Sequence, residues 1–178
     1  PSTPADVKGR LAAAVRDPDP VLFFEHKSLY ATKGEVPNGE HIDELGTARV
    51  VRKGNDLTIL ALAAMVPRAL DAAVRLEKED GMSTTVVDVR SLVPLDTQTI
   101  LTEVSRTGRA VTVEENPRLC GWGAEVASII ADEIFYDLDG PIIRITTPHI
   151  PLPSVDHLED LAMPSVDRIV ATIRDRVD

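Results

Sequence analysis

The chain has 178 residues and a formal net charge of −10. This charge argues against nucleic acid as a partner, because nucleic-acid binding needs a basic surface that displaces counterions, and it equally disfavours an anionic membrane. Hydrophobic residues make up 43% of the chain, enough for a packed core, but aromatic residues only 3%, so the core must be built from Val, Ile, Leu and Ala.

Cysteine content and hydropathy also restrict the class of protein. Cys120 is the single cysteine, so an internal disulfide is excluded and the chain suits a reducing cytosol. No apolar run approaches the roughly 18 residues of a membrane span, and no signal peptide opens the chain. Because the first residue is Pro1 and not Met, we expect a processed or truncated piece.

One helix is predicted near the start of the chain. The stretch STP at residues 2–4 is typical of a helix start, and Val7, Leu11 and Ala14 keep helical spacing. The sequence DPDP at residues 17–20 ends this helix, because each proline disfavours helical geometry in the residue before it. The turn itself has two open interpretations: a plain acidic turn, or a site for a hard cation, which prefers carboxylate and carbonyl oxygens.

A strand and a linker follow this helix. Residues 21–25, VLFFE, predict a buried strand, and the cluster Glu25-His26-Lys27 comes where that strand ends. An acid, an imidazole and an amine are compatible with a catalytic cluster, but a charged strand end is the simpler interpretation. Residues 31–47 contain three glycines, one proline and many charges without a period, which predicts a surface linker.

From residue 48 onward, apolar strands alternate with amphipathic helices. This order predicts right-handed crossovers and a mostly parallel sheet covered on both faces, an α/β fold. In the first helix Leu70, Ala73 and Val74 are expected to face inward, and Asp96 is expected to cap the second. The predicted strands are residues 57–63, 84–89, 109–114 and 141–146, and the predicted helices are residues 67–80, 97–106, 122–136 and a last helix after Pro164.

Two acids and a glycine pair are the candidate site residues in this part of the chain. Glu114 and Glu115 end a predicted parallel strand, where ligands gather in open sheets; Glu115 is a possible acid or base, but a solvated or helix-capping carboxylate is the simpler interpretation. Gly121-Trp122-Gly123 lacks the third glycine of a dinucleotide fingerprint. A phosphate site at the helix start and a tight strand-to-helix turn stay open, the turn being simpler.

Metal and nucleophile motifs are absent from the sequence. The histidines have no partner at a metal-ligand spacing, so a zinc site is not expected. No GxSxG elbow and no P-loop occurs. The residues alone therefore indicate an α/β domain without a self-evident active site. The four histidines are His26, His41, His149 and His157.

Several stretches together resemble a known family. FFEHK-x-LY at residues 23–30 and DVRSLVPLD at residues 88–96, with TVEENPRLCGWGAEVASII at residues 112–130, resemble the β subunit of the thiamine-diphosphate-dependent decarboxylase component of 2-oxo acid dehydrogenase complexes. The resemblance runs in order over essentially the whole chain. It implies that residues 1–45 are the end of a pyrimidine-binding domain plus linker, and that residues 46–178 form a transketolase-type C-terminal domain.

The resemblance also implies a fold and a reaction. The fold is a three-layer α/β/α domain whose sheet is mostly parallel with one antiparallel strand. The intact α/β enzyme decarboxylates a pyruvate-type or branched-chain 2-oxo acid on thiamine diphosphate and reductively acylates lipoyl groups of an acyltransferase core. Magnesium accompanies the cofactor in the α subunit, and the cofactor supplies the chemistry. The family's catalytic residues lie before Pro1, so no catalytic or cofactor-binding residue is assigned and the isolated chain is expected to be inactive.

Two weaker sites follow from the same resemblance. Branched-chain members bind potassium at the turn after the first helix, and the matching positions are Ala14, Asp17 and Asp19. The C-terminal domain serves assembly into an α2β2 heterotetramer and docking to the basic subunit-binding domain of the acyltransferase, which suits an acidic chain. The candidate docking residues are Asp132, Glu133, Asp137 and Asp139; an ordinary solvated face is an equal alternative.

Two alternatives and one localisation complete the expectations. The same domain also ends transketolase and deoxyxylulose-phosphate synthase chains, and the piece could act as a stand-alone interaction module. The FFEHK-x-LY stretch favours the dehydrogenase over other thiamine enzymes. The resemblance implies a cytoplasmic protein in bacteria or one of the mitochondrial matrix in eukaryotes, and the cytoplasm is preferred.

Overall fold

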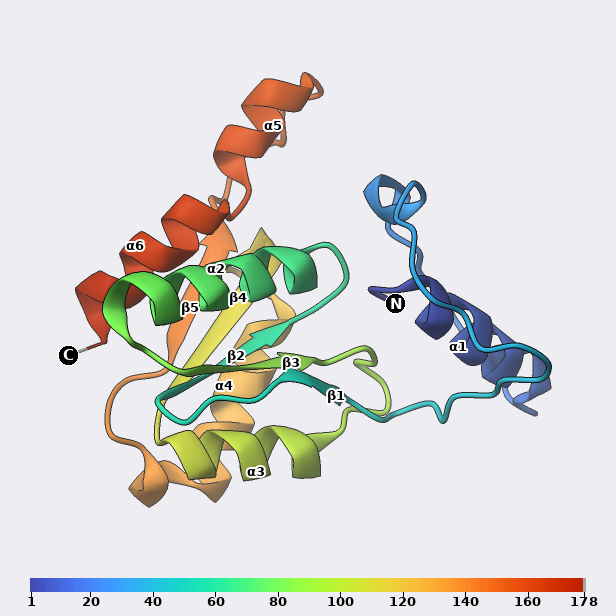
Figure 1. The fold of residues 1–178 in the computed structure, drawn as a ribbon, viewed down its shortest axis with the longest axis horizontal. Helices are drawn as coiled ribbons and strands as arrows, with labels where there is room; N and C mark the ends of the chain where they lie inside the picture. Colours follow the sequence, from blue (N-terminus) through green and yellow to red (C-terminus); the bar gives the residue numbers. More distant parts are fainter. Residues whose placement is uncertain (178) are drawn as a thin grey trace.

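The structure is a computed structural model that describes residues 1–177. Five strands form one sheet in the order β1-β3-β2-β4-β5 (Figure 1). β3 pairs with β2, β2 with β4 and β4 with β5 in parallel, whereas β1 runs antiparallel to β3. The sheet therefore confirms the expected fold class. The strands are β1 Arg49–Arg52, β2 Leu57–Ala61, β3 Thr84–Asp88, β4 Ala110–Pro117 and β5 Ile143–Thr147.

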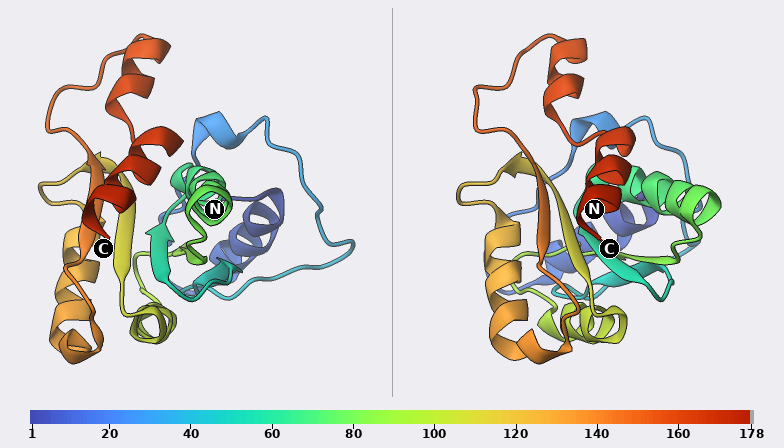
Figure 2. Two further views of the ribbon diagram at one scale, coloured as in Figure 1. Left: turned by 60° about the vertical axis from the view of Figure 1, so that its left-hand side comes forward. Right: turned by 90° about the vertical axis from the view of Figure 1, so that its left-hand side faces the viewer.

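Helices cover both faces of this sheet (Figure 2). α2 (Met65–Asp80) and α6 (Val166–Arg176) pack in one apolar core, whereas α3 (Thr97–Thr107) and α4 (Trp122–Glu133) pack in another. Alternate residues of β2 serve the two cores, with Ile59 on the first side and Leu60 on the second, both fully buried. A parallel strand buried on both faces is apolar along nearly its whole length, and the predicted, nearly continuous apolar strand is confirmed as β2, in which Thr58 is the one polar residue.

The caps of these helices follow the predicted chemistry. The Asp96 side chain accepts a hydrogen bond from the Thr99 N–H at 3.0 Å, which satisfies one of the unpaired amides at a helix start. α2 ends at Gly81 and α3 at Gly108, both in the left-handed region that glycine adopts without strain. The prediction that Val74 faces inward is wrong: Val74 is 54% exposed, and Ala69, Ala72 and Leu76 are buried instead.

Two features of the C-terminal region escaped sequence analysis. The strand β1 is short and half-buried, with a register shift between Val50 and Arg52. A further short helix, α5 (Asp156–Ala162), projects away from the body of the domain (Figures 1 and 2). Prolines at positions 151, 153 and 164 flank α5 in the sequence. Because proline disfavours helix in the residue before it, a helix of only two turns was not predicted there. Two single 3₁₀ turns, η1 (Lys27–Leu29) and η2 (Phe135–Asp137), complete the elements.

The N-terminal region is built differently. α1 (Pro4–Arg16) is confirmed and starts with a capping box between Thr3 and Asp6. However, its buried face is not the apolar stripe: Asp6, Gly9 and Arg10 are buried, whereas Leu11 is exposed. A Cβ on Gly9 would lie 2.7 Å from the Cβ of Asp43, so only glycine allows this close approach.

The buried strand predicted at residues 21–25 is wrong. Residues 21–26 are extended but pair with no strand among the described residues, and Leu22 and Phe24 are 84% and 80% exposed. A strand is stable only when a neighbour accepts its backbone hydrogen bonds, and the five-stranded sheet offers it none. Residues 31–47 wrap from this segment to β1 without regular structure, as a linker would (Figure 1). Within residues 1–177 no helix is both long and apolar enough to span a membrane.

Candidate functional site

The carboxyl ends of β2, β3, β4 and β5 meet at one edge of the sheet, the edge where ligands gather in parallel α/β folds. Three groups of charged residues lie at or beside this edge: one around Glu114, one around His26 and Glu115, and one that joins α1 to β3. Whether any of them can carry chemistry depends on how many of their polar atoms are already engaged.

Glu114 is a fully buried carboxylate whose partners come from three elements. Arg144 on β5 donates to both oxygens, each at 2.8 Å, and the Thr112 hydroxyl and the Asn116 amide donate at 2.8 and 3.0 Å. The Gly123 N–H donates at 3.1 Å from the first turn of α4. Burial is the largest influence and raises the pKa of Glu114, but these hydrogen bonds outweigh it, and its pKa lies below the ordinary value.

The two glycines of the Gly121-Trp122-Gly123 turn leave room for the Glu114 carboxylate. A Cβ on either glycine would collide with the Glu114 carboxylate, so both positions must be glycine for the helix to start there. The place of an anion at the N-terminus of α4 is therefore filled by a side chain of the protein itself. The tight-turn interpretation is confirmed and the phosphate-site interpretation is wrong.

His26 and Glu115 are brought together across 89 positions of sequence. The His26 Nε2 lies 2.9 Å from Glu115 Oε1, and the Ser28 hydroxyl lies 2.7 Å from His26 Nδ1. Both ring nitrogens are thus engaged, and both His26 and Glu115 are partly exposed. Glu25 of the same cluster is directed elsewhere: it accepts from the Tyr30 hydroxyl at 3.2 Å and raises the pKa of that phenol. The arrangement tethers the N-terminal segment to the sheet.

The third group, here called the α1 cluster, comprises Asp6, Arg10, Asp43, Arg49, Thr47, Asp88 and Arg90. Arg90 at the end of β3 donates to Asp6 at 3.1 Å and to Asp43 at 2.6 Å, and Arg49 contacts Asp6 at 3.1 Å. Burial is again the largest influence on Asp6, but the hydrogen bond from Thr3 and the two arginines outweigh it and lower its pKa.

Asp88 completes the α1 cluster and shows the opposite pKa shift. It is fully buried on β3, and its Oδ1 has no hydrogen-bond partner among the described residues. Burial raises its pKa, which the hydrogen bond from Ser2 only partly opposes. This cluster was not predicted, because the partners lie up to 86 positions apart and only the T-x-x-D capping box is a local signal.

The predicted potassium residues stay a prediction. Asp17 and Asp19 are exposed, and the Asp19 N–H donates to Asp17 Oδ1 at 3.0 Å. The Asp17 N–H donates to the Ala13 carbonyl at 3.0 Å, one position before Ala14. Within residues 1–177 no group of three or more His, Cys, Asp or Glu side chains is placed to hold a metal ion, so none of the four histidines belongs to such a group.

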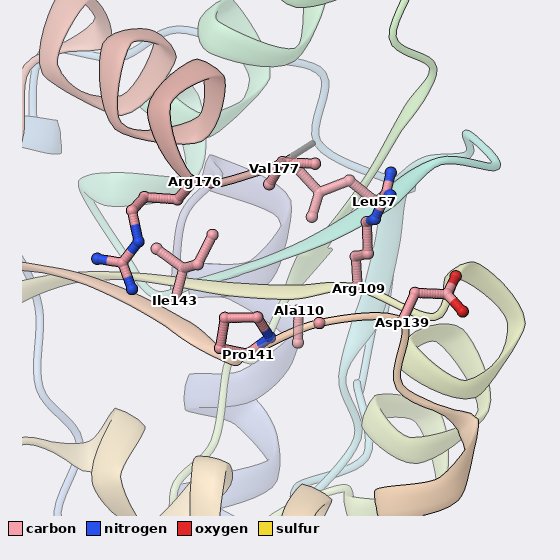
Figure 3. A pocket seen from close by; sticks show the side chains of 9 residues that line it. Leu57, Arg109, Ala110, Asp139, Pro141, Ile143, Arg176 and Val177 are labelled. Carbon is pink, nitrogen blue, oxygen red and sulfur yellow. The ribbon is translucent and has the colours of Figure 1, made fainter.

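The predicted docking residues lie at the other edge of the sheet. Asp132 and Glu133 are exposed in the last turn of α4, and Asp137 accepts from the Ser105 hydroxyl at 2.5 Å. Asp139 lines a pocket of about 170 Å3 beside Arg109 and the amino ends of β2, β4 and β5 (Figure 3). The acids therefore share one exposed region but form no closed binding site.

A second, larger pocket of about 500 Å3 lies in the N-terminal region. It is lined by the first turn of α1 and by residues 25–32, with Glu25, His26 and Tyr30 among them. Of its polar side chains, His26 is paired with Ser28 and Glu115, and Glu25 with Tyr30. Ser2 and Thr3 are both paired with Asp6. A binding pocket needs convergent free polar groups, and this one offers few.

Comparisons with known proteins match this geometry. The family model of the transketolase C-terminal domain matches residues 46–169. A solved split-gene transketolase, an inactive β4 tetramer, has a TM-score of 0.69 and 30% sequence identity, and the match covers 81% of this chain and 46% of that one.

Curated relatives extend the likeness to the N-terminal region. In Bacillus subtilis (strain 168), the acetoin:2,6-dichlorophenolindophenol oxidoreductase subunit beta is 46% identical over 172 residues, 96% of this chain and 50% of the relative. The 2-oxoisovalerate dehydrogenase subunit beta is 45% identical over 177 residues, 98% and 54% of the two chains. The pyruvate dehydrogenase E1 component subunit beta is 43% identical over 175 residues, 98% and 53%.

The chain therefore spans about half the length of the curated relatives it matches. Its sheet order, its covered faces and the matched residues agree on one family. The chain belongs to the transketolase C-terminal domain family, and its relatives over nearly its full length are β subunits of pyruvate, 2-oxoisovalerate and acetoin dehydrogenase systems.

Proposed function

We propose that this chain is the C-terminal part of the β subunit of a 2-oxo acid dehydrogenase. The observation that carries the proposal is the identity of 43–46% to such β subunits along nearly the whole chain, including the N-terminal region that lies outside the family match. The alternatives, another thiamine enzyme or a stand-alone module, account for residues 46–169 but not for the likeness of residues 1–45.

The role of this part is structural. Thiamine diphosphate, held with magnesium in the intact enzyme, supplies the electron sink for decarboxylation. The two candidate groups at the carboxyl edge of the sheet are engaged within the chain: Glu114 is bonded to Arg144, and both ring nitrogens of His26 have partners. The chain by itself is therefore inactive, and its parent enzyme acts on a 2-oxo acid and passes the acyl group to a lipoyl group.

We further propose that residues 1–45 are the end of a pyrimidine-binding domain. The exposed apolar side chains of residues 21–24 and the unpaired extended backbone there support this, since a sheet contributed by earlier residues would cover both. The boundary near residue 46 agrees with the start of the family match.

Assembly is the third part of the proposal. The parent protein pairs with an α subunit and with a second β subunit, as the subunit names of the relatives and the β4 tetramer of the solved neighbour lead us to expect. Asp132, Glu133, Asp137 and Asp139 then dock the basic domain of the acyltransferase. Asp132→Lys with Glu133→Lys should weaken a salt-sensitive complex, whereas Asp71→Lys on the exposed face of α2 should not; equal affinities would refute the docking site.

The fourth part of the proposal is that potassium binds at Ala14, Asp17 and Asp19. The backbone at the end of α1 supports this site. The helical partner of the Ala14 carbonyl would be the N–H of residue 18, but Pro18 has none. This carbonyl therefore stays available at the negative end of α1. Potassium should raise the melting temperature above that in equal sodium, and Asp17→Asn with Asp19→Asn should abolish the difference. Identical melting in both salts would exclude the site.

The test of the main function uses the full-length β chain. Co-expressed with its α subunit, it should release carbon dioxide from pyruvate or a branched-chain 2-oxo acid in the presence of thiamine diphosphate and magnesium, while residues 1–178 alone release none. Activity of the short chain, or none of the assembled enzyme with any 2-oxo acid, would contradict the proposal. The compartment follows from the source: the cytoplasm of a bacterium, or the mitochondrial matrix of a eukaryote.

A further inference from the structure

Asp88 is the acid of the α1 cluster that no arginine neutralises. Asp6 and Asp43 each form ion pairs with two arginines, whereas within residues 1–177 no ion pair reaches Asp88. Asp88 is 0% exposed at the end of β3, and its Oδ1 accepts no hydrogen bond from any described residue. An ionised carboxylate that is buried without a cation or several donors is unfavourable. The surroundings of Asp88 therefore favour the neutral, protonated form of its carboxyl group.

The hydroxyl of Ser2 lies between two acids of this cluster. Its Oγ is 3.3 Å from Asp6 Oδ2 and is also hydrogen-bonded to Asp88 Oδ2. A hydroxyl has one hydrogen and donates it to one acceptor at a time. If both acids were ionised, one of the two contacts would lack a hydrogen and would place two oxygens with lone pairs against each other inside the protein. A proton on Asp88 removes this conflict, because Asp88 then donates to Ser2 and Ser2 donates to Asp6.

Asp6 is the acid of this pair that stays ionised. Arg49 and Arg90 donate to its two oxygens, each at 3.1 Å, and the Thr3 N–H donates at 3.2 Å. A proton on Asp6 would take an acceptor away from these charged donors. Burial is the largest influence on Asp88 and raises its pKa, which the Ser2 hydroxyl and the nearby cations oppose only in part. Asp88 is thus the member of the pair for which protonation is favourable.

Charges of both signs and a path to solvent surround Asp88. The charged groups that face it are the Pro1 ammonium, Asp6 and Arg10 of α1 and Arg49 of β1, and Arg90 and Asp43 complete the cluster. The arginines are engaged with other acceptors: Arg10 donates to the Thr47 carbonyl, Arg49 to Asp6 and Arg90 to Asp6 and Asp43. Ser2 also lines the pocket of about 500 Å3 in the N-terminal region, so a proton can pass from Asp88 through this hydroxyl to solvent.

We propose that the fold holds Asp88 in its protonated form, and that loss of this proton loosens α1 from the sheet. An ionised Asp88 would leave two anions to share the one hydrogen of Ser2 and would repel Asp6. Moving the first turn of α1 away relieves both, because it opens Asp88 to water. The folded chain binds this proton more tightly than the unfolded chain, so the stabilisation is fully present below the ordinary aspartate value of 3.8 and is lost as the pH rises through the higher, folded pKa.

Nuclear magnetic resonance of the 178-residue chain, labelled with ¹³C at the aspartate carboxyl carbons, tests the proton itself. The Asp88 resonance is the one absent from Asp88→Asn, and the Asp6 resonance is the one absent from Asp6→Asn. At about pH 5 the Asp88 resonance should keep the position of a protonated acid, while that of Asp6 is already ionised. An Asp88 resonance that titrates at or below the ordinary aspartate value would overturn the proposal.

Hydrogen exchange tests the attachment of α1. Protection factors in α1, each corrected for the intrinsic exchange rate, should fall as the pH rises, by at most about tenfold per pH unit because one proton is lost. The fall should be smaller in Asp88→Asn, since an amide keeps a donor and cannot ionise. His41, which lies against Gly9 of α1, is present in both chains, so the difference between the chains is the readout.

The same substitution in the ionised neighbour is the matched control. At about pH 5, Asp88→Asn should keep the protection of α1 within about threefold of the unaltered chain, because the amide replaces a neutral group. Asp6→Asn should lower it at least ~tenfold, because it removes the charged acceptor of two arginines. Equal losses in the two variants would mean that Asp88 is ionised like Asp6, and would overturn the proposal.

The N-terminal ammonium needs a control of its own, because it faces Asp88 and also changes charge with pH. Acetylation of Pro1 removes this charge and should move the fall in protection to higher pH, since a nearby positive charge favours ionised Asp88. A fall that disappears on acetylation but persists in Asp88→Asn would assign the effect to the ammonium and contradict the proposal. Decarboxylation by the assembled enzyme enters none of these measurements, so the proposed function and the role of Asp88 can fail independently.

Discussion

Different interactions stabilise residues 1–45 and residues 46–177: ion pairs and hydrogen bonds in the first region, and apolar cores in the second. The second region has two apolar cores, one on each face of the sheet, and its strands β2 and β3 are completely buried. The first region adds no large side chain to either core and is attached through the α1 cluster and the His26–Glu115 pair. Apolar burial scales with area and is hard to reverse, whereas a buried ionic contact stabilises only while every partner is present.

This difference agrees with the proposed division into a C-terminal domain and the end of a preceding one. The region with two cores matches the family model, and the region attached by charges begins before it. A segment joined by ion pairs keeps a defined position without a core of its own, which is expected where a chain passes from one domain to the next.

The largest effect is expected when the Glu114–Arg144 pair inside the second region is broken. Arg144→Met leaves a buried carboxylate without its main partner and should lower the free energy of unfolding by ~3–5 kcal/mol. Urea denaturation followed by circular dichroism measures this. Arg174→Met, which breaks an exposed pair with Asp80, is the matched control and should change little. Equal effects of the two changes would contradict the assigned role of Glu114.

A different result is expected for the arginine that joins the two regions. Arg90→Met leaves Asp6 and Asp43 without their shared partner and should cost ~1–3 kcal/mol. The loss should be local: hydrogen exchange should become fast in α1 while β2 and α2 keep their protection. Uniform loss of protection in both regions would show that α1 belongs to the same cooperative unit as the sheet.

The helices and strands of the second region could be predicted from the sequence, whereas the packing of the first region could not. Apolar period and capping residues predicted α2, α3, α4, α6 and four strands correctly, because those signals are local. They failed in α1, where Asp6 and Arg10 are buried instead of Leu11, since the partners that neutralise them lie in β1, just after β3 and in the linker. Glu114 was noted only as one of two acids at the end of a predicted strand, with Glu115 as the possible acid or base, because its partner Arg144 lies 30 positions away and carried no local signal.

Acid should weaken the second region through Glu114. Its pKa in the folded state lies below the ordinary value of 4.5, so the folded protein binds its proton less readily than the unfolded chain. The stabilisation is therefore present above that ordinary value and is lost as the pH falls through the lower, folded pKa. Urea midpoints between about pH 7 and pH 3 should fall less steeply in Glu114→Gln than in the unaltered chain. Parallel curves would show that other carboxylates account for the acid loss.

The smallest effect is expected at the second joint. His26→Ala removes the contact with Glu115, a partly exposed pair, and should cost ~1 kcal/mol or less. Exchange of the amides in residues 27–32 should accelerate, while the unfolding midpoint of the domain stays nearly unchanged. A shift of the midpoint as large as that of Arg90→Met would mean that the pair is more than a tether.

Hydrogen exchange of the unaltered 178-residue chain tests the division into two regions most directly. Amides of β2, β3 and β4 should exchange only through global unfolding, those of α1 faster, and those of residues 20–26 and 31–45 fastest, because few backbone amides there bond to a helix or strand; the Asp43 N–H, which donates to the Gly9 carbonyl of α1, is an exception. The predicted result is a sharp rise in protection after residue 46. Protection in α1 equal to that of β2 would contradict it, and would make the two regions one cooperative domain.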